Sequence, residues 1–484
     1  MIETTIETDY LVVGSGAVGL AFIDSLLQET DDRVVVVDRH HGPGGHWNDA
    51  YPFVRLHQPS SYYGINSLPL GGGGLDPDPL NLGMTERASS AQIIDYYERA
   101  MAAMLATGRV AHHPMSAHST SADGTHQITS QLTGITTTVH VRKKVVDTTY
   151  LNTAVPSTRP PKYDVADGVT CVPVNALADV RTPPTGFVVV GAGKTGIDAC
   201  LWLLSQGVPG DRITWIMPRD SWFQNRANVQ SGAEFLTTSF GAMATQMEAI
   251  AASDSLPDLF ARLESTGQLL RLDPAVEPEM YHAAVVSEAE LDALRTIDNV
   301  VRLGRVQRIE RDRIVLTDGS VPADPGALYV DCSASAAELR PPVPVFAGDT
   351  ITPQFVRPFQ PTFSAAMIAW VEAHYDDDSA KNELCGVVPL PDAPLSWLTM
   401  QAAGMLNQYI WSQHPDLQRW VASSRLDGFT AMARAVARDD HEKVAVLRRF
   451  SSAAKAAGAH LPTLLAATSP ATATSTSSSL QGTP

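Results

Sequence analysis

Two stretches of the chain repeat the same order of apolar and glycine-rich positions. Four apolar residues, at 10–13 and again at 187–190, lead directly into a glycine-rich hexapeptide. Helix-like segments follow, at about residues 18–28 and 195–205. Short apolar runs bounded by glycine are typical of buried strands, so the pattern predicts two strand–turn–helix units.

Each unit continues into a second apolar run, at 33–37 in the first and 213–217 in the second. These runs predict the next strand of each sheet, because strands that alternate with helices are typical of parallel α/β sheets. The endings differ, since Asp38 closes the first run and Pro218-Arg219-Asp220 closes the second.

The rest of the chain is mostly helical in pattern. Residues 231–300 are rich in Ala, Leu, Glu and Met and predict a helical insertion, with amphipathic spacing from 256 to 270. Further expected elements are a hairpin over 305–320, a hairpin turn at Gly348-Asp349, a helix over 363–374 with its N-cap near Thr362, and helices over 395–449. The last 17 or so residues lack apolar content and predict a disordered tail.

The two hexapeptides are dinucleotide fingerprints. They read Gly14-Ser15-Gly16-Ala17-Val18-Gly19 and Gly191-Ala192-Gly193-Lys194-Thr195-Gly196. The first glycine permits a tight turn, the second lets the backbone approach a pyrophosphate, and the third lets the helix pack on the strand. The phosphates then sit at a helix N-terminus. Two such sites predict two dinucleotides brought face to face, which is typical of redox enzymes. The candidate binding residues are Gly14, Gly16, Ala17, Gly19, Gly191, Gly193, Lys194, Thr195 and Gly196.

Asp38 lies 19 residues beyond Gly19, where a carboxylate can accept hydrogen bonds from ribose hydroxyls and repel a 2′-phosphate. The first site is therefore expected to hold FAD or NAD, with Asp38 and its neighbour Arg39 as candidate ligands. Alternatively, Asp38 simply caps the end of the strand at the protein surface.

Arg219 stands where the second unit would otherwise place an acid. A guanidinium there can grip a 2′-phosphate, so the second site is expected to prefer NADP. The alternative is a solvated arginine paired with Asp220. Lys194 and Arg226 could add positive charge near the phosphates, or be ordinary surface residues.

Composition and charge narrow the class of protein further. The chain has 484 residues and a formal net charge of −17, which argues against nucleic-acid and anionic-membrane partners. No apolar stretch approaches the roughly 20 residues of a membrane span, and the acidic N-terminus does not resemble a secretory signal, so the cytoplasm is expected. The four cysteines are scattered, which excludes a closely spaced dithiol motif and a zinc pattern.

Gly44-Gly45-His46-Trp47 and the loop over residues 51–63 follow the first fingerprint. With the two fingerprints, they resemble the flavin-containing monooxygenase-like class of two-dinucleotide-binding flavoproteins, over about the first 225 residues. The resemblance implies that Gly45, His46, Trp47 and Gln58 lie beside the flavin of FAD. His57 and Asn66 are the catalytic candidates; His57 could instead be a buried structural histidine, and Asn66 a turn residue.

The chain also departs from this family's pattern. The segment from Tyr163 to Ala176, where the family has a histidine-containing signature, holds no histidine. The linkers expected at 147–150 and 331–334 are altered as well. We therefore expect a divergent member of the class.

The two fingerprint units predict an α/β fold with two Rossmann-like dinucleotide-binding domains, and the resemblance implies that the NADP domain is inserted in the FAD domain. The expected parts are the FAD domain at 1–155, the NAD(P) domain at 156–330, the return to the FAD domain with a helical C-terminal region at 331–465, and the tail at 466–484.

The resemblance implies an enzyme that oxidises NADPH, reduces FAD and oxygenates a small organic molecule with dioxygen through a flavin C4a-(hydro)peroxide. The flavin would carry the chemistry, and the protein would position it. The alternatives are a flavin oxidase or dehydrogenase without oxygen transfer, and a catalytically silent FAD-binding regulator. The substrate and a possible homodimer stay open.

Overall fold

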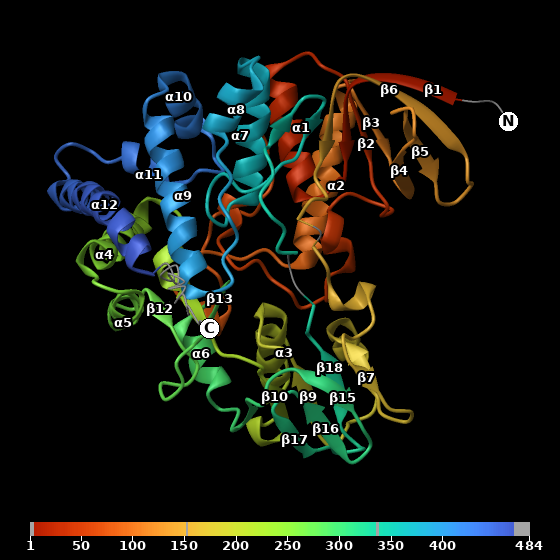
Figure 1. Ribbon diagram of the computed structural model, residues 1–484, viewed down its shortest axis with the longest axis vertical. Coiled ribbons are helices and arrows are strands. Elements are labelled where there is room, and N and C mark those ends of the chain that lie inside the picture. The colour runs from red at the N-terminus through yellow and green to blue at the C-terminus, as the bar shows by residue number, and fades with distance from the viewer. Residues whose placement is uncertain (1–3, 152, 335–337, 469–484) are drawn as a thin grey trace, which may run out of the picture.

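The computed structural model describes residues 4–151, 153–334 and 338–468. Two mainly parallel sheets lie apart in the molecule, with helices between and beside them (Figure 1). The first sheet has the strand order β19-β20-β6-β1-β2-β3. Its parts are β1 (Thr4–Val13), β2 (Val34–Val37), β3 (Val110–His113), β6 (Thr136–Asp147), β19 (Phe346–Ala347) and β20 (Thr350–Ile351), with β4 (Ser116–Thr120) and β5 (His126–Ser130) attached through β6.

Three helices cover the first sheet. They are α1 (Ala17–Glu29), α2 (Ser90–Ala106) and α7 (Pro361–His374). Residues 362–371 of α7 are all buried, because this helix packs against α1 and is apolar on every side. The helix begins at Pro361 rather than with Thr362 as its N-cap, since proline is well tolerated in the first helical turn.

The second sheet is parallel throughout and has the strand order β14-β10-β9-β18-β8. Its strands are β8 (Cys171–Pro173), β9 (Phe187–Val190), β10 (Ile213–Ile216), β14 (Asn299–Val301) and β18 (Leu328–Asp331). Helix α3 (Lys194–Ser205) follows β9 and packs against α6 (Glu288–Leu294). The expected hairpin over 305–320 is confirmed and gains a third strand, because β15 (Val306–Ile309), β16 (Arg313–Leu316) and β17 (Gly319–Pro322) form a meander beside β7 (Asp164–Val165).

The chain enters the second sheet only after β6 and returns to the first sheet at β19 and β20. The second unit is therefore nested within the first, as the sequence predicts. The return contains the expected hairpin turn, since β19 and β20 pair antiparallel around Gly348 and Asp349.

The prediction of a helical insertion over 231–300 is only half right. Helices α4 (Leu236–Ala252) and α5 (Leu256–Ser265) lie there. However, β12 (Leu269–Leu270) and β13 (Met280–Val286) pair with β11 (Ser221–Asn225), and β14 belongs to the second sheet. Composition averaged over 70 residues conceals these short strands, whose pairing partners are distant in sequence.

The C-terminal region is helical, as expected, and lies on the left in Figure 1. It comprises α8 (Asp378–Leu384), α9 (Pro394–Ser412), α10 (Pro415–Ser423), α11 (Phe429–Arg434) and α12 (His441–Thr468). Residues 466–468, expected in the tail, belong to α12, because Leu461 and Leu464 still anchor its last turns in the core. The rest of the predicted tail, 469–484, lies outside the described residues. Among the described helices, none is both long and apolar enough to cross a bilayer.

Candidate functional site

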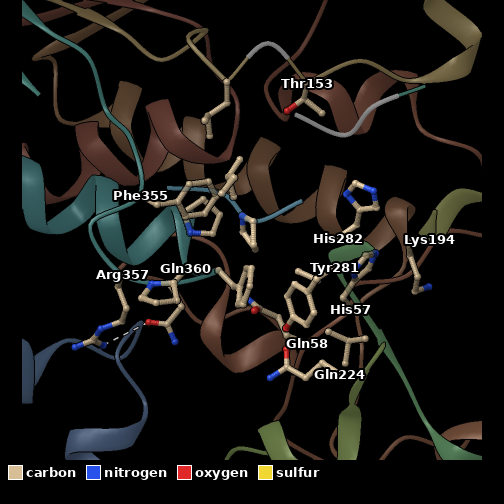
Figure 2. Close-up of a pocket in the computed structure, with 18 of the residues that line it drawn as sticks. His57, Gln58, Thr153, Lys194, Gln224, Tyr281, His282, Phe355, Arg357 and Gln360 are labelled. Atoms are coloured by element: carbon tan, nitrogen blue, oxygen red, sulfur yellow. Dashed lines mark hydrogen bonds between the residues drawn. The ribbon is translucent and has the colours of Figure 1, made fainter. Parts of the chain in front are cut away.

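A cavity of about 2400 Å³ opens where the carboxyl ends of both parallel sheets come together. Val13 and Val37 from the first sheet and Val190 from the second all line it. In open α/β folds, ligands bind outside the carboxyl ends of parallel strands. Figure 2 shows part of this cavity, and His57, Lys194 and His282 are among the labelled residues that line it.

The first fingerprint adopts the tight turn that its glycines predict. Gly14 has φ +104°, and a Cβ on Gly19 would lie 2.1 Å from the Gly14 carbonyl oxygen. Gly14, Gly16 and Ala17 line the cavity, whereas Gly19 packs the helix on the strand. Helix α1 has Gly16 at its N-cap with no capping side chain. Its first N–H groups are therefore available to an anion in the cavity.

The second fingerprint has the same geometry. Gly191 has φ +133°, and a Cβ on Gly196 would lie 2.2 Å from the Gly191 carbonyl oxygen. A Cβ on Gly193 would meet nothing within 4 Å, so space stays open in front of α3. Gly193 caps α3 without a side-chain hydrogen bond. Gly191, Gly193, Lys194 and Thr195 line the cavity, and both turns fit the phosphates of a dinucleotide.

Asp38 lines the cavity, but its carboxylate is already engaged. One oxygen accepts from the backbone N–H of Ser15 at 2.6 Å and from its hydroxyl at 3.0 Å. The other accepts from the backbone N–H and the ring of His40, at 2.8 and 2.9 Å. A carboxylate has about four acceptor sites, so a ribose hydroxyl must displace one of these donors. Burial alone would raise the pKa of Asp38, but the hydrogen bonds from His40 and Ser15 outweigh it and hold that pKa below its usual value.

His40 is a part of the site that sequence reasoning missed. Its ring joins Asp38 to Asp49, with an Nε2–Oδ2 distance of 2.8 Å to Asp49. The hydrogen bond to Asp38 is the largest cause that raises the pKa of His40. In the sequence, the only local sign of this link is that a histidine stands two residues after Asp38. Arg39, which precedes it, is exposed at the cavity wall.

The Gly-Gly-His-Trp segment lies over the first fingerprint. Gly45 has φ +57°, and a Cβ there would lie 2.9 Å from the Cα of Gly16. Trp47 is buried and donates from Nε1 to the Tyr63 hydroxyl at 2.7 Å. His46 lies beside the Trp47 ring, and burial lowers the pKa of His46 to about 4. Gly45, His46 and Trp47 all line the cavity, so these three candidates lie together as the resemblance implies.

His57 and Gln58 also line the cavity (Figure 2). Burial, followed by the positive charges of Lys194 and Arg226, holds the pKa of His57 well below its usual value. His57 is therefore a neutral imidazole at physiological pH, able both to donate and to accept a hydrogen bond.

Asn66 is not brought to this site. It does not line the cavity, and its side-chain oxygen accepts a 3.0 Å hydrogen bond from the Ser424 hydroxyl. The flanking backbone explains the difference, since Ile65 N–H donates to the Tyr96 hydroxyl and Ser67 N–H donates to Asp24. These contacts hold the segment against α1 and α2, away from the cavity.

Arg219 lines the cavity and is exposed to it. The alternative pairing with Asp220 does not occur, because Asp220 forms a two-pronged ion pair with Arg302 at 2.7 and 3.1 Å. Lys194 also lines the cavity, where it pairs with Asp198 one turn along α3. Arg226 does not serve the phosphates, since it is buried and pairs with Glu290 at 2.7 Å.

The walls carry a strong excess of positive charge, although the whole chain has a net charge of −17. Among the described lining residues the acids are Asp38 and Asp427, and Asp427 is paired with Arg357. The cationic lining residues are Arg39, Arg55, Lys162, Lys194, Arg219, Arg305, Arg357 and Lys455. A cavity of this charge concentrates anionic ligands.

One arm of the cavity is apolar and lies among the helices. It is lined by side chains from the 231–300 region and from the C-terminal helices. These residues are Met243, Met247, Trp397, Met405, Leu461 and Leu465.

Comparisons with known proteins agree with this geometry. A family model described as "NAD(P)-binding Rossmann-like domain" matches residues 12–61. "Uncharacterized protein Rv2000" of Mycobacterium tuberculosis (strain ATCC 25618 / H37Rv) is 47% identical over 462 residues, covering 95% of this chain and 85% of the relative. "Uncharacterized protein Mb2023" of Mycobacterium bovis matches to the same extent.

Among solved structures, cyclohexanone-bound cyclohexanone monooxygenase in its Rotated conformation aligns with a TM-score of 0.51 and 11% identity, over 93% of this chain and 98% of that chain. An identity this low shows only that the two proteins share a fold. At 47% identity over nearly its whole length, the chain belongs to the family of these mycobacterial proteins, and it shares the fold of cyclohexanone monooxygenase.

Proposed function

We propose that this protein is an FAD-dependent oxidoreductase that oxidises NADPH and uses dioxygen to oxygenate a small organic molecule. One observation carries the proposal: two fingerprint turns, each opening an uncapped helix, face the same cavity. The cationic walls supply the complementary charge for two pyrophosphates. The apolar arm supplies room for an organic substrate.

FAD is assigned to the part formed by residues 1–155 and 331–465, and NADPH to residues 156–330. Gly14, Gly16 and Ala17 would hold the FAD pyrophosphate, and Asp38 with Arg39 its adenosine end. Gly45, His46, Trp47 and Gln58 would flank the flavin, and His57 would offer a neutral imidazole to ligands at the flavin edge. Gly191, Gly193, Lys194 and Thr195 would hold the NADPH pyrophosphate, with Arg219 at the 2′-phosphate. Asn66 is left out, because its side chain turns to Ser424.

When bound, FAD would take a hydride from NADPH and then deliver electrons to dioxygen, which is chemistry that the cofactor itself supplies. The overall reaction consumes NADPH, one proton, dioxygen and the substrate, and yields NADP⁺, water and the oxygenated product. The protein's own residues hold the two dinucleotides, keep both imidazoles at the flavin neutral, and exclude bulk water from the apolar arm.

The test uses the purified full-length protein supplied with FAD. We expect a yellow protein that NADPH bleaches without oxygen and that incorporates one atom of isotopically labelled dioxygen into an added apolar ketone or thioether. Bleaching followed only by hydrogen peroxide release would favour an oxidase. A yellow protein that neither NADPH nor NADH bleaches would favour a regulatory flavoprotein, and failure to bind FAD would overturn the proposal.

A further inference from the structure

Strand β13 contains an irregularity directly at the cavity wall. It pairs in parallel with β11, with Trp222 opposite Tyr281 and Gln224 opposite Val285. Phe223 of β11 therefore lies opposite three residues of β13, namely His282, Ala283 and Ala284. Within this bulge, Ala283 has φ +56°. A residue other than glycine rarely adopts this conformation, and it persists only where the surrounding structure imposes it.

The bulge is held firmly on its N-terminal side. Tyr281 is 1% exposed, its N–H donates to the Asp392 carbonyl at 3.1 Å, and its ring packs on Trp397. Tyr281 and His282 both line the cavity, and their rings point in different directions from the strand (Figure 2). His282 projects into the cavity, as Figure 2 shows. Bulges of this kind often redirect a side chain beside a functional site.

Arg219 lies in the turn that follows β10, and the end of this strand is where a dinucleotide of this fold places its adenosine ribose. Ser221 pairs with Met280 across the two strands, and the Met280 N–H donates to the Asp220 carbonyl at 3.2 Å. Arg219 immediately precedes these contacts and lines the same cavity. Arg219, from the turn between β10 and β11, and His282, from β13, thus line the same cavity, near enough for the charge of Arg219 to act on the His282 ring.

The charged groups that act on His282 lie in two loops, one before β11 and one before α9. Burial lowers the pKa of His282, Arg219 lowers it further, and Asp392 opposes both. The carboxylate of Asp392 accepts from the Ser396 hydroxyl, and that of Asp220 is paired with Arg302. Among the described residues, no side chain or backbone group forms a hydrogen bond with the His282 ring. The imidazole is therefore neutral and available in the free protein.

We propose that His282 is a second ligand for the 2′-phosphate of NADPH beside Arg219, and that it makes the preference for NADPH over NADH depend on pH. This inference rests on the proposed function, because it assumes that the second fingerprint binds a nicotinamide dinucleotide. The bulge would exist to bring the imidazole to the phosphate.

The direction of the pH effect follows from charge. A phosphate dianion beside the imidazole favours the protonated ring, so binding raises the pKa of His282 and takes up a proton. Affinity for the 2′-phosphate should then increase as the pH falls from about 8.5 to about 6.5, above the second pKa of a phosphate at about 6. NADH has no 2′-phosphate and should bind independently of this residue.

The test is calorimetric titration of the full-length FAD-loaded protein with adenosine 2′,5′-bisphosphate and with 5′-AMP, which lacks the 2′-phosphate. Buffers of different ionisation enthalpy report the protons taken up, which requires no variant. We expect net proton uptake with the bisphosphate only. His282→Asn should weaken bisphosphate binding by about 3- to 10-fold near pH 6.5 and by less than about 2-fold near pH 8.5.

Two further variants keep the result interpretable. His140→Asn removes an exposed imidazole on β6, outside the cavity, and should change nothing. Ala283→Gly accepts the same φ without strain and should keep the pH dependence. Tight bisphosphate binding without proton uptake would overturn the role of His282 alone. Binding of neither ligand would overturn the nicotinamide site and the proposed function with it.

Discussion

The Tyr51 hydroxyl donates a 2.6 Å hydrogen bond to Asp198 and so joins the loop beside the first fingerprint to the helix of the second. The same carboxylate pairs with Lys194, the first residue of α3. Phe53 stacks on Trp202 nearby, with ring centroids 4.8 Å apart. These contacts tie together the two parts that are proposed to hold FAD and NADPH.

We expect Tyr51→Phe to weaken this link without creating a cavity. Asp198 would lose one buried donor, so the free energy of unfolding should fall by about 1–2 kcal/mol. NADPH affinity should fall several-fold, because Lys194 would be held less firmly. Urea unfolding and NADPH titration measure the two effects. Tyr150→Phe is the control, since its hydroxyl makes a comparable bond to the Pro341 carbonyl at an exposed position. Equal effects of both variants would contradict the proposed link.

Two glycine substitutions should separate folding from binding. Gly196→Ala places a Cβ 2.2 Å from a backbone oxygen, so it should lower the free energy of unfolding by several kcal/mol. Gly193→Ala places its Cβ in open space at an allowed φ of −79°, so the fold should keep its stability. The methyl group would, however, occupy the space assigned to the pyrophosphate, and NADPH affinity should fall by about 10-fold or more. Unfolding curves and NADPH titrations report each effect. Unchanged NADPH binding in Gly193→Ala would argue against this assignment.

Arg219→Ala should weaken NADPH binding by about 10- to 100-fold while changing NADH binding by less than about 3-fold. The reason is that the guanidinium faces the cavity and forms no ion pair with Asp220, which Arg302 already occupies. Titration with both nicotinamides measures the ratio. Arg311→Ala removes an exposed arginine that donates to the Asp167 carbonyl outside the cavity, and it should leave both affinities unchanged. A similar loss of affinity for NADH and NADPH would show that Arg219 does not bind the 2′-phosphate.

The buried pair of Arg226 and Glu290 should make stability depend on pH. Burial alone would raise the pKa of Glu290, but Arg226 and Lys194 outweigh it and lower that pKa below 4.5. A group with a lowered pKa in the folded state stabilises the protein above its unfolded pKa, and this contribution is lost as the pH falls through the folded value. Glu290→Gln should cost about 3–5 kcal/mol at neutral pH, because it leaves Arg226 without its charge partner.

Urea unfolding of the wild type and Glu290→Gln, repeated from neutral to acidic pH, tests this expectation. The difference in unfolding free energy between the two proteins should shrink below about pH 4.5. Glu248→Gln is the matched control, since Glu248 pairs with Arg449 at an exposed site and should contribute less than about 1 kcal/mol. A difference that stays constant with pH would contradict the role assigned to Glu290.

Contacts between residues that are distant in sequence explain why some predictions were wrong or incomplete. The apolar pattern predicts a first strand at 10–13, yet β1 begins at Thr4, because its polar first half pairs with β6. Asn66 follows a flavoprotein-like loop in sequence, but contacts of its neighbours with Tyr96 and Asp24 turn it toward Ser424. Arg226 was expected either near the phosphates or on the surface, and instead it completes a buried ion pair with a residue 64 positions away. None of these outcomes has a signal in the local sequence.

The sequence by itself determined the geometry of both fingerprint turns, since a tight turn, a close approach and an uncapped helix start depend on glycines within six residues. The nesting of one unit inside the other came from the resemblance, through the two linkers expected at 147–150 and 331–334. Only the tertiary structure decided which side chains share the cavity. His282 reaches it from a bulge of β13 between residues that pair with β11, and Asp38 is held by His40 and Ser15. Such arrangements depend on contacts between distant segments, whose energies exist only once the chain has folded.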